Sequence, residues 1–322
     1  MDKVPTARTL DVLLFDGVNL LDVAGPVQAF DTARFDGRPV YRHRYLSITG
    51  RAVRANCGLT LGVAGGLAER APGADLLIPG GDIDDVAAFP ALRAAIRATL
   101  AAPGDARVIS VCSGALALAA AGVLDGRVAT THWSRQRDIA RHPDVRWDLD
   151  RIMAGDGRVW TSAGVTTGID LALHIIRADC GKAAALAVAR ELVVQLRRTG
   201  GQSQYAMHLA GQFTDDDALT RLIEAVLAAP ARDWTLDTLG AEAGMNPRTL
   251  SRRFRQAMDM TPVGFVERTR VDHARGLLLG GLAAKRVAVD AGFGDLQRMR
   301  RAFQRQLGVG VRDYADAFRD GA

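Results

Sequence analysis

Cys112 stands where an apolar run gives way to small residues, in "VISVCSGALALAAAG" (108–122). The first half has the pattern of a buried strand and the second half that of a helix. A strand that ends in a cysteine and turns at once into a helix places the thiol at a helix N-terminus, where its pKa falls and the nucleophilic thiolate is favoured. The alternative is structural, because cysteine is also a small residue that fits a tight turn. The residue types alone leave both interpretations open.

Three other segments could complete a site around this cysteine. Gly80 and Gly81 end an apolar run, and their backbone N–H groups could form an oxyanion site. His132, in "TTHW", is a candidate base at a strand end, and Asp22, in "LLDVAGP", offers a carboxylate. The histidines show no ligand-spaced pair, and the three cysteines are too widely separated for a metal site or a disulfide framework. We therefore predict no metal site and no cofactor.

The first two thirds of the chain alternate strand-like and helix-like segments. Strands are predicted at 10–15, 41–50 and 74–82, helices at 25–33 and 90–101, a hairpin at 151–164, and a long helix at 167–196 broken near Gly181. Such alternation is typical of a mostly parallel sheet with helices on both faces. The segment 197–213 loses this periodicity and gains Gly, Gln and Ser, which predicts a linker.

The net charge of +5 falls entirely within residues 230–322, and arginine supplies nearly all of it. Arginine suits the recognition of phosphate and of guanine edges. The same region contains a faint repeat of two helix-turn-helix patterns, at 235–256 and 285–306. In each copy, glycine supplies the turn, a polar residue caps the next helix, and apolar residues face inward.

The second helix of each copy presents basic residues and almost no acid on its outer face, where a major groove could receive it. The residues expected to contact DNA are Arg248, Ser251, Arg252, Arg255, Gln297, Arg300 and Arg301. A single basic amphipathic helix is usually only a solvated face, but two tandem units with turns and caps favour DNA binding. Gln and Ser beside the arginines indicate base reading rather than nonspecific binding.

Residues 1–196 resemble the class I glutamine amidotransferase-like (ThiJ/PfpI) superfamily, in "GVNLLDVAGP", "LLIPGGD", "VCSGALALAAAGVLDGRVATTHW" and "TSAGVTTGIDLALHII". The resemblance implies an α/β flavodoxin-like domain with Cys112 at the elbow, Asp22 at the position of the acid that contacts the thiol, and His132 near it. The intracellular proteases of this superfamily carry histidine directly after the cysteine, where this chain has Ser113, so a protease is disfavoured. The isonitrile hydratase branch shares an Asp and a Cys-Ser/Thr pairing, which leaves hydration chemistry open.

Residues 214–318 resemble the AraC/XylS-type DNA-binding domain, in "GMNPRTLSRRF" and "AGFGDLQRMRRAF". That resemblance implies an all-α domain with two helix-turn-helix modules that enter successive major-groove segments. After "LGV" the family usually has a proline that this chain lacks, which should soften the turn before the final helix. Together the two resemblances are those of GlxA-type regulators, in which an amidotransferase-like domain senses a small nitrogenous metabolite.

We therefore expect a DNA-binding transcription regulator rather than an enzyme, with double-stranded operator DNA, a small-molecule effector and a second copy of the chain as partners. The residues expected to contact the effector are Asp22, Gly80, Gly81, Cys112, Ser113 and His132. No signal peptide or membrane span is recognisable, so a cytoplasmic protein without membrane contact is expected. The alternative is a cysteine-dependent hydratase or amidohydrolase with an accessory DNA-binding domain, in which Cys112, Asp22 and His132 would be catalytic.

Overall fold

The computed structural model describes residues 7–194, 216–279, 281–307, 310–312 and 314. The chain divides into two compact units, Met1–Arg198 and Thr199–Ala322. The linker predicted at 197–213 lies outside the described residues. Each unit is described by itself below.

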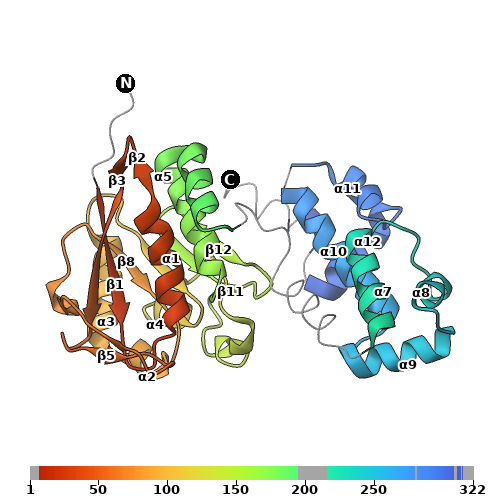
Figure 1. The fold of residues 1–322 in the computed structure, drawn as a ribbon, viewed down its shortest axis with the longest axis horizontal. Helices are drawn as coiled ribbons and strands as arrows, with labels where there is room; N and C mark the ends of the chain where they lie inside the picture. The colour runs from red at the N-terminus through yellow and green to blue at the C-terminus, as the bar shows by residue number, and fades with distance from the viewer. Residues whose placement is uncertain (1–6, 195–215, 280, 308–309, 313, 315–322) are drawn as a thin grey trace. The chain divides into compact units, whose positions relative to one another are not determined.

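A seven-stranded sheet forms the centre of the first unit (Figure 1). Its strands lie in the order β12 (Met153–Asp156), β13 (Val159–Ser162), β9 (Val108–Val111), β8 (Asp75–Ile78), β1 (Arg8–Leu14), β4 (Tyr41–Ser47) and β7 (Gly65–Gly66). Neighbouring strands are parallel except in the β12–β13 hairpin. The central strands β8 and β9 are buried along their whole length, which explains why they are continuous apolar runs rather than alternating ones.

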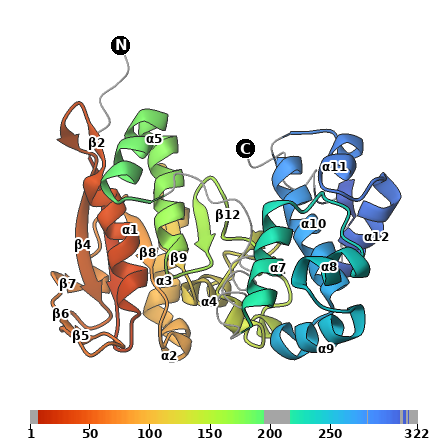
Figure 2. The same ribbon diagram turned by 45° about the vertical axis from the view of Figure 1, so that its right-hand side comes forward.

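Helices cover both faces of this sheet (Figures 1 and 2). The helices α1 (Leu20–Thr32) and α5 (Thr167–Glu191) pack against each other on one face. The other face carries α2 (Asp84–Ala88), α3 (Pro90–Ala101) and α4 (Gly114–Ala120). The predicted mostly parallel α/β fold is confirmed, and α5 is interrupted at Gly181, whose φ is 84°.

The first helix starts earlier than predicted. The sequence indicated 25–33, but α1 begins at Leu20 because the side chain of Asn19 caps it by accepting the N–H of Leu21 at 3.0 Å. Pro26 lies inside α1. As a result, Asp22 sits in the first turn of a helix rather than in the loop before it.

The first unit also contains short strands and 3₁₀ turns outside the main sheet. Short strands pair as β2 (Arg34–Phe35) with β3 (Arg38–Pro39), β5 (Val53–Arg54) with β6 (Thr60–Leu61), and β10 (Val128–Ala129) with β11 (Arg146–Trp147). Three 3₁₀ turns occur at η1 (Leu67–Glu69), η2 (Trp133–Arg135) and η3 (Ile139–Arg141). The last two follow β10 and His132 in the chain.

The second unit is helical in its described part. Its helices are α7 (Asp217–Ala228), α8 (Leu236–Ala243), α9 (Pro247–Met258), α10 (Pro262–Leu279), α11 (Ala284–Asp290) and α12 (Leu296–Leu307). Two apolar clusters hold them together, one under α7–α9 and one under α11–α12, and α10 contributes to both. Among the helices described in either unit, none is long and apolar enough to cross a membrane.

Candidate functional site

Cys112 occupies the turn between β9 and α4, where the sequence predicted an elbow. Its φ is 57°, in the left-handed region that is costly for a residue with a Cβ atom. The N–H of Cys112 donates to the carbonyl of Ser162 at 3.0 Å, and the hydroxyl of Thr131 donates to the carbonyl of Cys112 at 2.8 Å. A Cβ atom on Gly164 would lie 2.3 Å from the Cβ of Cys112, so only glycine fits beside it. Neighbouring strands therefore hold the strained backbone in place.

The side chain of Asp22 contacts the thiol of Cys112. This carboxyl is fully buried and accepts the N–H groups of Val165 at 2.6 Å and Gly80 at 3.2 Å. Burial raises the pKa of Asp22, and burial together with the adjacent Asp22 raises the pKa of Cys112 to about 12. Of the two interpretations that the sequence left open, this arrangement favours the structural one, because burial and Asp22 outweigh the opposing effect of the N–H of Ser113 on the thiol pKa.

The backbone N–H groups of the glycine turn after β8 donate to side chains of the protein itself. The N–H of Gly80 donates to Asp22, and the N–H of Gly81 donates to the hydroxyl of Ser113 at 3.0 Å. The same hydroxyl donates back to the carbonyl of Gly81 at 3.1 Å, and Ser113 is buried. Both N–H groups that the sequence offered for an oxyanion site therefore already have acceptors. The side chain of Ser113 holds this turn through two hydrogen bonds.

His132 is half-buried and caps η2, three residues after the end of β10, and the preceding residue Thr131 contacts Cys112. Its Nδ1 is 2.7 Å from the hydroxyl oxygen of Ser134, and its ring centroid is 5.3 Å from that of Trp133. Within the described ranges, Cys112 is not a hydrogen-bond partner of His132. Burial, followed by the charge of Arg135, lowers the pKa of His132, so the imidazole is neutral near pH 7.

Arg135 is a cation at this site that sequence reasoning missed. Its guanidinium donates to the carbonyl of Gly81 at 3.2 Å and pairs with Asp84 at 3.2 Å and Asp138 at 3.1 Å. Its charge acts on Cys112 by lowering the thiol pKa, against the larger effects of burial and Asp22. The segment "WSRQR" has no spacing that singles this arginine out. In the part of the chain that is described, no group of three or more His, Cys, Asp or Glu residues could hold a metal ion.

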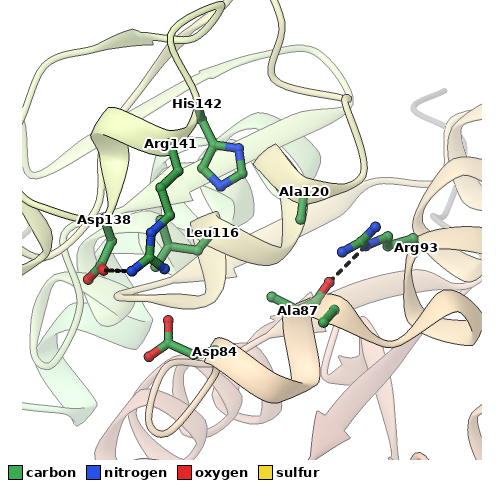
Figure 3. Close-up of a pocket in the computed structure, with 9 residues that line it drawn as sticks. Asp84, Ala87, Arg93, Leu116, Ala120, Asp138, Arg141 and His142 are labelled. Atoms are coloured by element: carbon green, nitrogen blue, oxygen red, sulfur yellow. Dashed lines mark hydrogen bonds and ion pairs between the residues drawn. The ribbon is translucent and has the colours of Figure 1, made fainter.

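A cavity of about 170 Å³ opens beside Asp84 and Asp138, the two acidic partners of Arg135 (Figure 3). Its floor is apolar and comes from α2 and α4, and charged side chains surround it. The lining residues are Asp84, Ala87, Ala88, Arg93, Leu116, Ala120, Asp138, Arg141 and His142. Figure 3 shows Asp84 and Asp138 toward one end and Arg93 toward the other. The six residues predicted to contact an effector are not among those that line this cavity.

The first helix-turn-helix unit has the local geometry that the sequence indicated. Gly244 ends α8 with φ 63°, and the side chain of Asn246 caps α9 by accepting the N–H of Thr249 at 2.9 Å. Leu250 and Phe254 are fully buried beneath α9. The opposite face of α9 forms a shallow hollow lined by Arg248, Ser251, Arg252, Arg255 and Gln256, which contains four of the predicted DNA-contacting residues.

The second helix-turn-helix unit repeats this arrangement. Asp295 precedes α12 and accepts the N–H of Arg298 at 2.8 Å, while Met299 and Phe303 are fully buried. The remaining residues predicted to contact DNA, Gln297, Arg300 and Arg301, are exposed on α12.

The loop before the first helix-turn-helix unit contacts both α10 and the second unit. Arg270 of α10 donates to the carbonyls of Pro230 at 2.9 Å and Arg232 at 2.8 Å, in the loop that leads into α8. The same loop lies against Gly292, which makes the turn of the second unit with φ 82°. Nothing in the sequence pattern indicated this contact.

The DJ-1/PfpI family matches residues 8–178, which hold the whole sheet and the Cys112 elbow. The chain belongs to the DJ-1/PfpI family. A second family, described as a helix-turn-helix domain, matches residues 239–317, from α8 onward, and this domain is of the AraC type. The two family resemblances predicted from the sequence are thus confirmed.

Two known proteins are similar to this chain over most of its length. The HTH-type transcriptional regulator GbdR of Pseudomonas aeruginosa is 26% identical over 311 residues, which are 95% of this chain and 83% of that protein. Among solved structures, a ThiJ/PfpI family protein from Pseudomonas syringae is similar with a TM-score of 0.55 at 23% identity, covering 76% of this chain and 95% of that one. The sequence similarity to the regulator therefore runs through both units.

An enzyme also resembles part of the chain. The isonitrile hydratase of Pseudomonas putida is 44% identical, but only over 68 residues, which are 21% of this chain and 29% of that protein. This match covers a much smaller share of both proteins than the match to the regulator. The longer similarity to a regulator agrees with the expectation that the chain is not an enzyme.

Proposed function

We propose that this protein is a sequence-specific transcription regulator, whose helical unit binds operator DNA and whose α/β unit binds a small metabolite. The family resemblance leads us to expect a homodimer, in which each of the two chains would contact one half-site. The protein would act in the cytoplasm. The proposal rests on both units together, because the full-length similarity is to a protein named as a regulator.

The pairing of the arginines is the observation that carries the proposal. Three arginines on α9 and α12 have acidic partners: Arg253 pairs with Asp216 at 3.1 Å, Arg298 with Asp295 at 3.4 Å, and Arg305 with Glu267 at 2.5 Å. The arginines that are predicted to contact DNA lack such acidic partners among the described residues. Within the described residues, no acidic side chain pairs with Arg248, Arg252, Arg255, Arg300 or Arg301.

Such unpaired, exposed arginines are suited to DNA. Their guanidinium groups can neutralise phosphates or form two hydrogen bonds with a guanine edge, and no protein contact has to be broken first. Ser251 and Gln297 beside them add donors and acceptors that distinguish bases. If these arginines served only to keep the helices soluble, there would be no need for those without acidic partners to share one face of each helix.

The chemistry of the elbow supports a sensing role for the α/β unit. A nucleophilic cysteine needs an accessible thiolate near neutral pH. Here the pKa of Cys112 is raised to about 12, and the expected oxyanion donors are engaged by Asp22 and Ser113. A unit of this kind can bind a small molecule without converting it.

A hydratase remains the second candidate, because the Cys112–Asp22 contact and the short similarity to isonitrile hydratase both favour it. It predicts that a bound nitrile, isonitrile or amide is consumed and that Cys112→Ser stops the consumption. Recovery of the ligand unchanged from the wild-type protein would exclude it.

In vitro selection from a pool of random DNA duplexes tests the regulator directly. The full chain should enrich one motif with two half-sites, and light scattering of the complex should give two chains per duplex. Recovery of unenriched, random sequences after repeated rounds would refute sequence-specific binding. A single half-site bound by one chain would refute only the dimer.

A further inference from the structure

We propose that the cavity beside Asp84 and Asp138 is a binding site for a small carboxylate-bearing metabolite, with Arg93 as the residue that binds the carboxylate. The inference rests on the proposed sensing function and places the effector next to the elbow rather than on it. A volume of about 170 Å³ has room for roughly six water-sized groups, at about 30 Å³ each. A short carboxylic acid or an amino acid has that size.

Arg93 is already oriented for this task. Its Nε donates to the carbonyl of Ala87 at 3.0 Å, which fixes the side chain at the cavity wall (Figure 3). Among the described residues, its two terminal nitrogens have no hydrogen-bond acceptor. A guanidinium that is held in place and still has free donors is suited to a carboxylate, which accepts two parallel hydrogen bonds.

The charges around Arg93 favour an anion at this end of the cavity. Arg141 pairs with Asp138 at 3.6 Å, toward the other end of the cavity (Figure 3). Among the residues that the structure describes, no acidic side chain pairs with Arg93 in this way. A carboxylate bound there would supply Arg93 with an anionic partner.

The remaining walls define what the rest of the ligand can be. Leu116 and Ala87 are buried under the cavity and offer an apolar surface for a short aliphatic chain. Asp84 and Asp138 at the far end share Arg135 as a partner, and Asp138 also pairs with Arg141 at 3.6 Å. Since these two arginines balance the charge of the two carboxylates, an ammonium group on the ligand is tolerated but not required. The carboxylate is the group that decides binding.

Calorimetry on the full-length protein with three probes of equal chain length tests this assignment. Butyrate carries the carboxylate alone, 2-aminobutyrate carries a carboxylate and an ammonium group, and butylamine carries the amine alone. We expect heat from butyrate and 2-aminobutyrate and none from butylamine. Arg93→Gln should weaken the binding of butyrate about tenfold or more, because a charge-assisted, two-point contact is lost.

The same helix offers a matched control. Arg97 lies one turn further along α3, and its Nε likewise donates to a backbone carbonyl, that of Ala121, at 2.8 Å, but it does not line the cavity. Arg97→Gln should leave butyrate binding unchanged. Arg93→Lys keeps the charge without the planar donors and should bind butyrate with an intermediate affinity.

Three results would overturn the assignment. Arg93→Gln could bind butyrate as the wild type does, none of the probes could bind, or Asp22→Asn could abolish binding while Arg93→Gln does not, which would return the site to the elbow. Selection of DNA by the wild-type protein is measured separately. If no probe binds to the cavity but the protein still selects a DNA motif, only the assignment of the cavity is refuted. If the protein selects no DNA motif, the proposed function itself is refuted.

Discussion

Gly292 and Ala231 lie so close together that a Cβ atom on Gly292 would be 2.6 Å from the Cα of Ala231. Gly292 belongs to the second helix-turn-helix unit and Ala231 to the loop that leads into the first, and Arg270 fixes this loop by donating to the carbonyls of Pro230 and Arg232. The two reading helices are therefore positioned by a backbone contact as well as by α10. A DNA site for this protein should consequently have one preferred spacing between its two contacted segments.

Gly292→Ala should destabilise the helical unit more than Gly294→Ala. Both glycines have positive φ, 82° and 78°, so both substitutions incur backbone strain. Only Gly292 has backbone within the reach of a new methyl group, whereas the space around Gly294 is open. We expect an additional loss of about 1–3 kcal/mol in the free energy of unfolding for Gly292→Ala, typical of overpacking. Urea denaturation of both variants measures it, and equal losses would mean that the contact yields freely.

Arg270→Ala should relax the spacing preference on DNA. The wild type should lose affinity when one base pair is inserted between the two contacted segments of a selected site, because its units cannot adjust. Without the two hydrogen bonds from Arg270, the variant should bind the original and the lengthened site more equally. Fluorescence anisotropy gives the ratio of the two affinities. A general loss of stability would lower both affinities and leave that ratio unchanged, so an unchanged ratio contradicts the prediction.

Alkylation of Cys112 should be slow near neutral pH and should accelerate with pH. Its raised pKa, about 12, keeps the thiol protonated, so the thiolate fraction increases about tenfold per pH unit below that value. Asp22→Asn removes the negative charge that raises this pKa, so the pKa should fall and the rate at about pH 8 should increase. Exposed Cys57 serves as the internal reference.

Mass spectrometry after iodoacetamide treatment, between about pH 7 and about pH 10, follows both cysteines in one sample. A rate for Cys112 that reaches its plateau below about pH 9 in the wild type would show a reactive thiolate. That outcome would also favour the hydratase over the sensor.

Arg301→Ala should cost about 1–3 kcal/mol of DNA binding at one base position and relax the preference there. Arg305→Ala, on the same helix, removes the same charge from a residue that is paired with Glu267. It should weaken binding to selected and scrambled duplexes alike, and only slightly. If the two variants show the same pattern, Arg301 does not read a base.

The sequence predicted the parts of this molecule that local patterns determine. The elbow at Cys112, the turn at Gly244 and the cap at Asn246 each depend on a few neighbouring residues, and each is found where it was predicted. The first helix begins at Leu20 rather than at residue 25 because the side chain of Asn19 caps it, and this cap was not recognised in the sequence.

What the sequence did not predict depends on contacts between distant segments. The pKa of Cys112 is raised because the fold buries the thiol, and the charge of Asp22, which the family resemblance already placed beside it, adds to this effect. The donors of Gly80 and Gly81 are lost to side chains from two other segments. Arg135 and Arg270 bond backbone carbonyls, which carry no sequence signature. The reading-face arginines stay a prediction until DNA binding is measured.

The ratio of affinities for a selected duplex and its scrambled counterpart, measured by anisotropy at physiological salt, tests the central claim most directly. A sequence-specific regulator should bind the selected duplex about 10³-fold or more tightly, and removing both Arg252 and Arg301 should bring this ratio toward one. Equal affinity of the wild type for both duplexes would contradict the account, because the arginines would then serve only to contact phosphates.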